Sequence, residues 1–381
     1  MGLPVNTISE PSAPSRLRIL IVGAGAVGTV LGSALSQRHE VAFLLKPSQA
    51  AAELTTHGLR LSVTRVPMRL LLQSARPARF CEGLPVFFSV DDAAKGPRWN
   101  YVILAVAASA HQDMEWLRGV IEDLCSMHGI DNMDGHTTGI GFVNGGVAGS
   151  ERDRFLRAGA HPAQLIQIGI SLIAWEPPLL PILARSATSA EVAGAAASAA
   201  ARCTEYVQPS PLLLCGPRAR VRPLVSALRS GGLPSIIVQS VDAELAYPDA
   251  VLVPLCCALE AVRWSFAGLR NDAALRALAA AAARECLAVT RATAHGRMVS
   301  LTNLVWLVVG WCIWGWTIHL LAVCAPLLLP FDVEAYLRHH FGHKRGVHKQ
   351  TGLFADALSA RMPPGREHAL ERLRQRVSHL D

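Results

Sequence analysis

The sequence Ile-Leu-Ile-Val-Gly-Ala-Gly-Ala-Val-Gly, from Ile19 to Gly28, decides the fold of this chain. Four apolar residues typical of a buried strand precede three glycines in the spacing Gly-x-Gly-x-x-Gly, and an Ala/Leu/Val stretch follows as far as Gln37. A strand, a tight turn and a helix in this order form the first unit of a dinucleotide-binding fold. Gly23 would let the chain turn out of the strand, Gly25 would let the backbone approach a pyrophosphate, and Gly28 would let the helix pack close to the sheet.

The beginning of the predicted helix would supply peptide N–H groups and the positive end of its dipole to the phosphates of a dinucleotide. We therefore predict that the turn and the first helical residues bind the cofactor, namely Gly23, Gly25, Ala26, Val27 and Gly28. The alternative is a glycine-rich turn without a ligand. The flanking strand, the helix and a second strand at the right distance favour binding.

The end of the second predicted strand indicates which dinucleotide is bound. The apolar run from Glu40 to Leu45 predicts a buried parallel strand, and Lys46 follows it. An enzyme that uses NAD would place an acidic residue there, against the ribose 2′-hydroxyl. A cation favours a 2′-phosphate instead, so we predict NADPH as the cofactor and Lys46 as one of its ligands. The alternative for Lys46 is a solvated loop lysine.

Strand-like and helix-like segments alternate through the N-terminal half of the chain. The predicted strands are Leu59 to Val63, Val86 to Ser89, Tyr101 to Val106, Gly139 to Val143 and Gln167 to Ala174, with further β-like runs at Leu212 to Cys215 and Ser235 to Val238. The predicted helices are His111 to Cys125, Gly149 to Ala158 and the Ala-rich run Glu191 to Ala201. This alternation predicts an α/β fold with a Rossmann-type, doubly wound parallel sheet.

The character of the sequence changes near residue 240. Ala- and Leu-rich stretches with helical spacing take over from Ala243 to Thr293, including the Ala-rich run Ala273 to Ala283. We therefore predict a flexible N-terminal tail over residues 1–16, an NADP-binding Rossmann domain over residues 17–240, and an all-helical C-terminal domain over residues 241–381.

The composition narrows the class of protein. With 51% hydrophobic and 17% charged residues, the 381-residue chain can bury a core and does not have the composition of a disordered protein. Its net charge of +7 is too small to predict binding to nucleic acid. The nine cysteines have no metal-binding spacing, so we predict no metal site, and the N-terminus does not resemble a secretory signal. The protein is expected to be cytoplasmic.

A hydrophobic segment, residues 304–329, lies in the C-terminal half. It contains no Asp, Glu, Lys or Arg and includes four tryptophans. About 20 apolar residues can span a bilayer, but Gly310, Gly315, His319 and Pro326 interrupt the run. The sequence leaves two alternatives open, a pair of buried helices and contact with a membrane.

Several of these stretches together resemble the ketopantoate reductase (2-dehydropantoate 2-reductase) family. The resemblance rests on Ile19 to Gly28, Phe43 to Lys46, Ala52 to Leu61, Tyr101 to Val106, and Val143-Asn144-Gly145 followed by Ser150-Glu151-Arg152. It implies an N-terminal Rossmann domain, a C-terminal all-α domain and NADPH-dependent reduction of a small-molecule 2-keto acid between them. A homodimer stays open.

The resemblance also assigns residues. The position of Lys46 is basic in the family and binds the 2′-phosphate, and the position of Asn144 lies beside the nicotinamide and the substrate. Val106, which ends the strand that begins at Tyr101, is expected to contact the cofactor.

The departures from the family concern catalysis. The lysine expected after the strand that ends at Val106 is Ala107, and the family's catalytic lysine would fall near Asp249. The two family asparagines that follow it fall near Val253 and Cys257. Pro248 and Pro254 are expected to disturb the helix that carries these positions.

Reduction of a ketone requires a group that stabilises charge on the carbonyl oxygen and delivers a proton to it. Asn144, His340 and Lys344 are the predicted catalytic residues, because histidine can act as an acid near neutral pH and the C-terminal cluster includes His348 and Lys349. The alternative for this cluster is a solvated basic turn or a phosphate-binding patch. Two functions stay open, a reductase and a catalytically inactive NADP-binding protein associated with a membrane.

Overall fold

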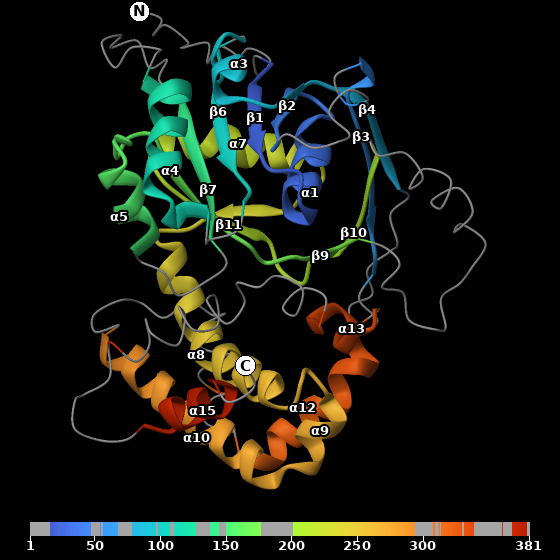
Figure 1. Ribbon diagram of the computed structural model, residues 1–381, viewed down its shortest axis with the longest axis vertical. Helices are drawn as coiled ribbons and strands as arrows, with labels where there is room; N and C mark the ends of the chain where they lie inside the picture. The colour runs from blue at the N-terminus through green and yellow to red at the C-terminus, as the bar shows by residue number, and fades with distance from the viewer. Residues whose placement is uncertain are drawn as a thin grey trace, which may run out of the picture.

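The computed structural model describes residues 16–46, 54, 56–67, 78–96, 98–106, 110–126, 138–144, 150–176, 201–293, 308, 312, 314–329, 331–338, 360 and 368–378. Two sheets with their helices form one part of the molecule, and a group of helices lies below them in Figure 1. This arrangement confirms the predicted α/β fold with a helical C-terminal part.

The larger sheet has eight strands in the order β12-β11-β8-β7-β6-β1-β2-β5. Their bounds are β12 (Ser235–Ile237), β11 (Leu212–Cys215), β8 (Leu165–Gly169), β7 (Gly139–Asn144), β6 (Tyr101–Leu104), β1 (Arg18–Val22), β2 (Glu40–Leu44) and β5 (Val86–Phe87). The strands from β8 to β5 pair in parallel, whereas β11 runs antiparallel to β8. The chain passes from β1 to β2 on one side and to β6 on the other, which makes β1 the point where the strand order reverses.

Both faces of this sheet are covered by helices, which explains why β1 is apolar without alternation. Ile19 and Ile21 pack against α1 (Ala26–Leu35) and α7 (Arg218–Ser230) on one face. Leu20 and Val22 pack on the opposite face against α3 (Val90–Ala94), α4 (Met114–Ile121) and α5 (Ser150–Arg157). The first three of these four β1 side chains are completely buried.

The smaller sheet has the strand order β4-β3-β10-β9 and contains two differences from the predicted elements. Its strands are β4 (Arg79–Leu84), β3 (Leu59–Arg65), β10 (Ala201–Val207) and β9 (Ile173–Trp175). The predicted strand Gln167 to Ala174 is therefore two strands in different sheets, β8 and β9. The reason is that its alternation of apolar residues does not reveal the change of pairing partner, from β7 to β10.

The second difference concerns the Ala-rich run Glu191 to Ala201. Its last residue, Ala201, begins β10 and pairs with Arg60 of β3, so pairing between distant strands overrides the helix propensity of alanine there. The remainder of that predicted helix lies outside the described residues. The sequence also did not predict α7, which follows β11 and covers β1.

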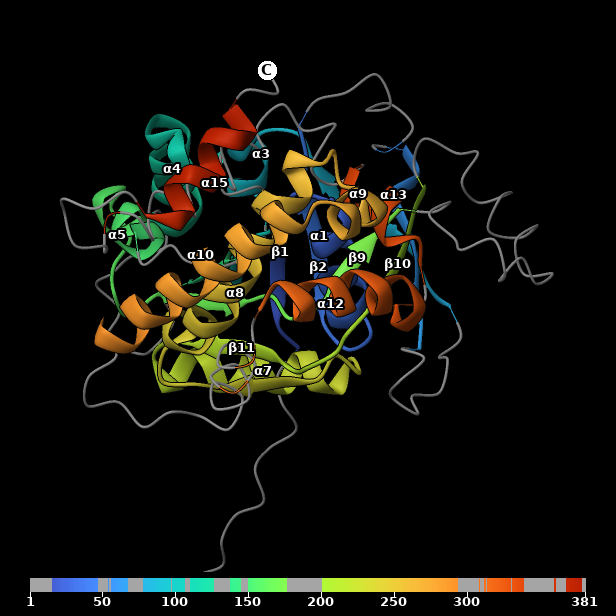
Figure 2. The same cartoon turned by 90° about the horizontal axis from the view of Figure 1, so that it is seen from below.

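The helical part consists of α8 (Val241–Ala261), α9 (Phe266–Asn271), α10 (Ala273–Thr293), α12 (Gly315–Leu328), α13 (Val333–Leu337) and α15 (Ala369–Ser378). Figure 2 shows α8, α10, α12 and α15 crossing in front of the sheets when the molecule is seen from below. The expected disturbance by Pro248 and Pro254 does not interrupt α8, which continues through both residues. Each proline removes one peptide N–H, but Ala250 and Val251 between them are buried in a core shared with α10 and α15, and this packing favours the helix.

The hydrophobic segment 304–329 is described mainly over α12. Ile318 and Ala322 are buried against α9 and α10, whereas Trp316 and Leu320 are 65% and 53% exposed. The helix α12 thus packs on one side and is exposed on the other, and residues 304–307, 309–311 and 313 lie outside the description. Among the described residues, no helix is both long and apolar enough to cross a membrane.

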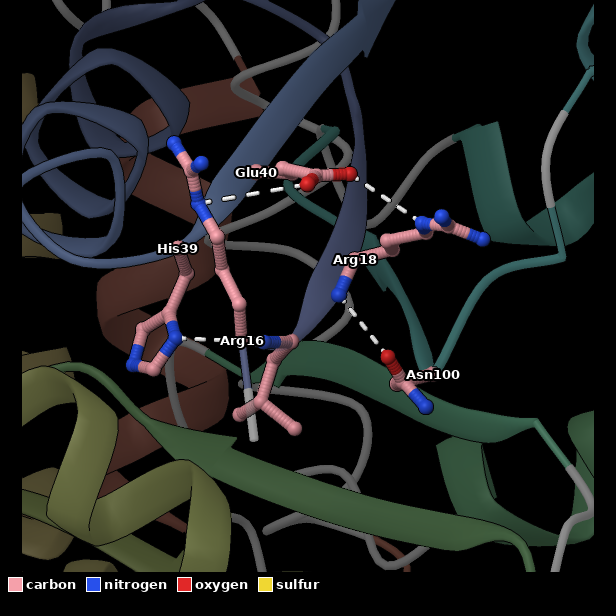
Figure 3. Close-up of polar contacts among 6 residues, drawn as sticks. Arg16, Arg18, His39, Glu40 and Asn100 are labelled. Carbon is pink, nitrogen blue, oxygen red and sulfur yellow. Dashed lines mark hydrogen bonds and ion pairs between the residues drawn. The ribbon is translucent and has the colours of Figure 1, made fainter. Parts of the chain in front are cut away.

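A polar cluster holds the amino-terminal edge of the larger sheet together (Figure 3). The peptide N–H of Arg18 donates to the side chain of Asn100 at 2.8 Å, and its guanidinium donates to the Glu40 carboxylate at 3.1 Å. The N–H of Leu17 donates to Nδ1 of His39 at 3.3 Å. These contacts join the start of β1 to the starts of β2 and β6. They anchor β1 at the end opposite to the glycine turn.

Candidate functional site

The turn between β1 and α1 requires glycine at two positions. Gly23 has a φ of 97°, in the left-handed region, and a Cβ there would lie 3.0 Å from both the carbonyl oxygen of Ala105 and Cγ1 of Val106. A Cβ on Gly28 would lie 2.1 Å from the carbonyl oxygen of Gly23. The turn is therefore pressed against the carboxyl end of β6 on one side and against α1 on the other.

Gly25, unlike Gly23 and Gly28, has open space beside it, because no atom lies within 4 Å of the place where its Cβ would be. It is the N-cap of α1, and no side chain caps the helix. The first peptide N–H groups of a helix have no partner within the helix. Open space next to these groups suits an anion, and the backbone of Gly25, Ala26 and Val27 fits the pyrophosphate of a dinucleotide.

Lys46 lies two residues beyond the end of β2 and is exposed. The N–H of Leu45 donates to the carbonyl of Phe87 at 2.9 Å, which keeps the chain on the sheet up to the residue before Lys46. No carboxylate in the described ranges forms an ion pair with the Lys46 ammonium group. Its charge is therefore available at the same edge of the sheet as the glycine turn.

Of the other predicted site residues, the structure describes Val106 and the backbone of Asn144 but not His340 or Lys344. Val106 is half-buried beside Gly23, and Asn144 ends β7, the strand next to β6. The strand ends that carry them therefore meet at one edge, although the side chain of Asn144 is not described. His340 and Lys344 lie outside the described residues. Their catalytic roles stay predictions.

The positions near which the resemblance places the family's catalytic side chains lie in α8 and are buried. Asp249 is 9% exposed, and Val253 and Cys257 are 6% and 2% exposed. Burial, with the nearby carboxylates of Glu260 and Asp249, raises the pKa of the Cys256 thiol to about 12. The thiol is therefore protonated at neutral pH and is not a nucleophile.

Two buried ionisable residues at the carboxyl edge of the sheet were not singled out from the sequence as a pair. His111, in η1 (Ala110–Gln112), and Glu151, near the start of α5, are 0% and 1% exposed. Nδ1 of His111 lies 3.6 Å from Oε1 of Glu151. Glu151 belongs to Ser150-Glu151-Arg152, one of the stretches on which the resemblance rests. The contact joins segments that follow two different strands, so no local sequence pattern connects Glu151 to His111.

Comparison with known proteins gives a family match over part of the chain and a common fold over most of it. Residues 19–132 match the family model described as "Ketopantoate reductase PanE/ApbA". No curated protein matches the chain.

Solved structures match nearly the whole chain at low sequence identity. The 2-dehydropantoate 2-reductase from Geobacter metallireducens GS-15 is 13% identical, covers 96% of this chain and 100% of its own, and has a TM-score of 0.60. D-mandelate dehydrogenase, in a ternary structure with NADH and anilino(oxo)acetate, is 14% identical, with 95% and 98% covered and a TM-score of 0.59. A PanE/ApbA family ketopantoate reductase from Ralstonia eutropha JMP134 is 14% identical, with 96% and 98% covered and a TM-score of 0.58. These likenesses show a common fold.

Proposed function

We propose, starting from the match of residues 19–132 to the ketopantoate reductase family model, that the protein is an NADPH-dependent oxidoreductase that reduces a 2-keto acid or a related carbonyl compound to the hydroxy compound. The observation that carries the proposal is the glycine turn. Gly23 and Gly28 fit only without side chains, whereas the space beside Gly25 is open and adjoins the uncapped beginning of α1. A turn without a ligand would not require open space at this position.

The proposed cofactor extends along the carboxyl edge of the sheet. The backbone of Gly25, Ala26 and Val27 would bind the pyrophosphate, and Lys46 at the end of β2 would bind the adenosine 2′-phosphate. An exposed ammonium group without an ion-pair partner in the described ranges supports NADPH over NADH. We also propose that the Rossmann domain ends near residue 240, just before α8 begins at Val241.

The nicotinamide, when bound, supplies the hydride that reduces the carbonyl carbon. The chain must then position the keto acid and deliver a proton to its oxygen. Asn144 ends β7, on the side of β1 away from the adenosine-binding strand β2, and we assign to its amide the orientation of the substrate carbonyl. His340 or Lys344 would deliver the proton, since Asp249 stands near the position of the family's lysine.

A second function is favoured by two observations. A buried carboxylate, Asp249, stands near the expected position of the catalytic lysine, and Trp316 and Leu320 expose an apolar side of α12. A catalytically inactive NADP-binding protein that associates with a membrane would be consistent with both features. The two functions share the cofactor site and differ in turnover.

Binding and turnover can be measured separately on the full-length protein. Calorimetric titration with NADPH and NADH tests the cofactor site, and loss of reduced-nicotinamide absorbance with a panel of 2-keto acids tests catalysis. Binding with turnover supports the reductase, and binding without turnover of any keto acid supports the inactive protein. If neither dinucleotide binds the folded protein, both proposals are wrong.

A further inference from the structure

Within the described part of the chain, the buried side chains of His111 and Glu151 lack the hydrogen bonds that such groups usually have. Both ring nitrogens of His111 and Oε2 of Glu151 are buried and have no hydrogen-bond partner among the residues that the structure describes. The 3.6 Å between Nδ1 and Oε1 is beyond the usual range of an N–H···O bond. Burying polar groups without partners costs free energy, so a pair of this kind calls for an explanation.

The surroundings hold both side chains firmly. The ring of His111 packs edge-to-face on Phe155 of α5, with centroids 5.3 Å apart, and Phe155 stacks on Phe142 of β7 at 4.6 Å. Phe142 and Phe155 are 1% and 0% exposed. The aromatic contacts orient the imidazole toward a carboxylate on the same helix as Phe155, and they exclude solvent that could replace either partner.

The pair joins the two segments that follow neighbouring parallel strands. η1 comes after β6, whose carboxyl end contacts the glycine turn through Ala105 and Val106. α5 comes after β7, which ends at Asn144. In a sheet of this topology the dinucleotide crosses the point where the strand order reverses, with one half on each side. Since Lys46 and β2 lie on the adenosine side, the segments after β6 and β7 lie on the side of the nicotinamide half.

We infer that His111 and Glu151 are positioning residues for the nicotinamide half of the bound dinucleotide. This inference rests on the proposed cofactor site. The contact between the two side chains sets the separation between η1 and α5, and therefore the position of the strand ends that carry Val106 and Asn144. Neither side chain reaches the ligand, because both are buried. Their effect is transmitted through the two segments that they join.

The test compares a whole dinucleotide with its adenosine half. Calorimetry would measure the dissociation constants of NADPH and of adenosine 2′,5′-bisphosphate for the full-length protein and for His111→Gln, Glu151→Gln and the double variant. We expect each single variant to weaken NADPH about tenfold, which corresponds to about 1.4 kcal/mol of coupling, and the double variant to be no weaker than the singles. The affinity for the bisphosphate should change less than about twofold. Val120→Ala in α4 serves as the matched control, because it removes a buried side chain from the same core and leaves both members of the pair in place.

A purely structural role would lower the midpoint of thermal unfolding and leave the ratio of the two dissociation constants unchanged. An unchanged ratio in the variants, additive effects in the double variant, or an equal change of the ratio in Val120→Ala would overturn the inference. If the wild-type protein binds neither NADPH nor the bisphosphate, the proposed cofactor site is wrong. If the wild-type protein binds both, the cofactor site stands, and the results for the variants then decide only the role of His111 and Glu151.

Hydrogen exchange of the wild-type protein provides a measurement that does not depend on the folding of any variant. Saturating NADPH should slow amide exchange in residues 110–126 and 150–157 relative to saturating adenosine 2′,5′-bisphosphate. Equal protection by the two probes would show that these segments do not respond to the nicotinamide half, and the inference would be wrong.

Discussion

The sheet part of this molecule owes its proposed role to backbone atoms, whereas the proposed role of the helical part depends on side chains. At the carboxyl edge of the large sheet, the geometry at Gly23, Gly25 and Gly28 depends on backbone atoms and on the absence of side chains. The chemistry that the resemblance implies for α8 would depend on particular side chains instead, and this chain has Asp249 and Cys257 near those positions. A binding site made of backbone atoms tolerates changes of sequence better than a site made of side chains. The proposed cofactor site and the proposed chemistry can therefore be tested independently.

The largest effect is expected at Gly28 in the sheet part. In Gly28→Ala the new Cβ would meet the carbonyl oxygen of Gly23 at 2.1 Å, and neither backbone segment can move without disturbing β1 or α1. We expect a loss of about 4 kcal/mol in the free energy of unfolding, measured by urea denaturation.

Gly25→Ala is the matched control, because its Cβ would enter open space. Its stability should stay within about 1 kcal/mol of the wild type, while NADPH affinity falls by about tenfold or more as the methyl group takes the place of the pyrophosphate. Equal stability of the two variants would contradict the packing described for the turn.

In the helical part, the two sides of α12 should respond differently to truncation. Ile318→Ala removes a side chain that is 1% exposed and should lower the free energy of unfolding by about 3 kcal/mol. Leu320→Ala, at a position that is 53% exposed, should change it by less than about 0.5 kcal/mol. Similar losses in both variants, measured by chemical denaturation, would mean that the outer side of α12 is covered in solution.

Lys46→Ala tests the specificity assigned to the sheet part. Removal of one ammonium group from the 2′-phosphate should weaken NADPH by about 1.5 to 3 kcal/mol, more than tenfold, and should leave NADH within about twofold. Dissociation constants from calorimetry provide the comparison, with Lys95→Ala as a control, since Lys95 forms an exposed ion pair with Asp92. Parallel losses for both dinucleotides would remove the assignment of Lys46.

The smallest effect is expected at the amino-terminal edge of the sheet. Burial, together with the charges of Arg16 and Arg38, lowers the pKa of His39, whose Nδ1 accepts the N–H of Leu17. The contribution of neutral His39 to stability is complete above the unfolded-state pKa of about 6.5. As the pH falls below that value the unfolded chain binds the proton first, so the free energy of unfolding decreases until the folded-state pKa is reached.

His39→Asn should retain an acceptor for the Leu17 N–H and abolish this titration. Denaturation midpoints measured across the acidic range should therefore show a shallower pH dependence in the variant. A dependence as steep as that of the wild type would show that other groups cause it.

Local patterns predicted the elements that form the first unit of the fold, because their signals lie within a few residues. β1, the glycine turn and α1 follow from a continuous apolar run and a spacing of three glycines. Predictions were wrong where distant partners decide the structure. The segment from Gln167 to Ala174 divides between two sheets, and Ala201 lies in a strand, because β9 and β10 pair with each other and β10 pairs with β3.

The sequence by itself determined the parallel sheet, the position of the glycine turn and the basic residue after β2. Each depends on backbone conformation and residue type over a short stretch of chain. Only the tertiary structure brought His111 to Glu151 and buried one side of α12. These contacts join segments whose separation in sequence is large, and their free energy arises only after the sheet has brought the strand ends to one edge.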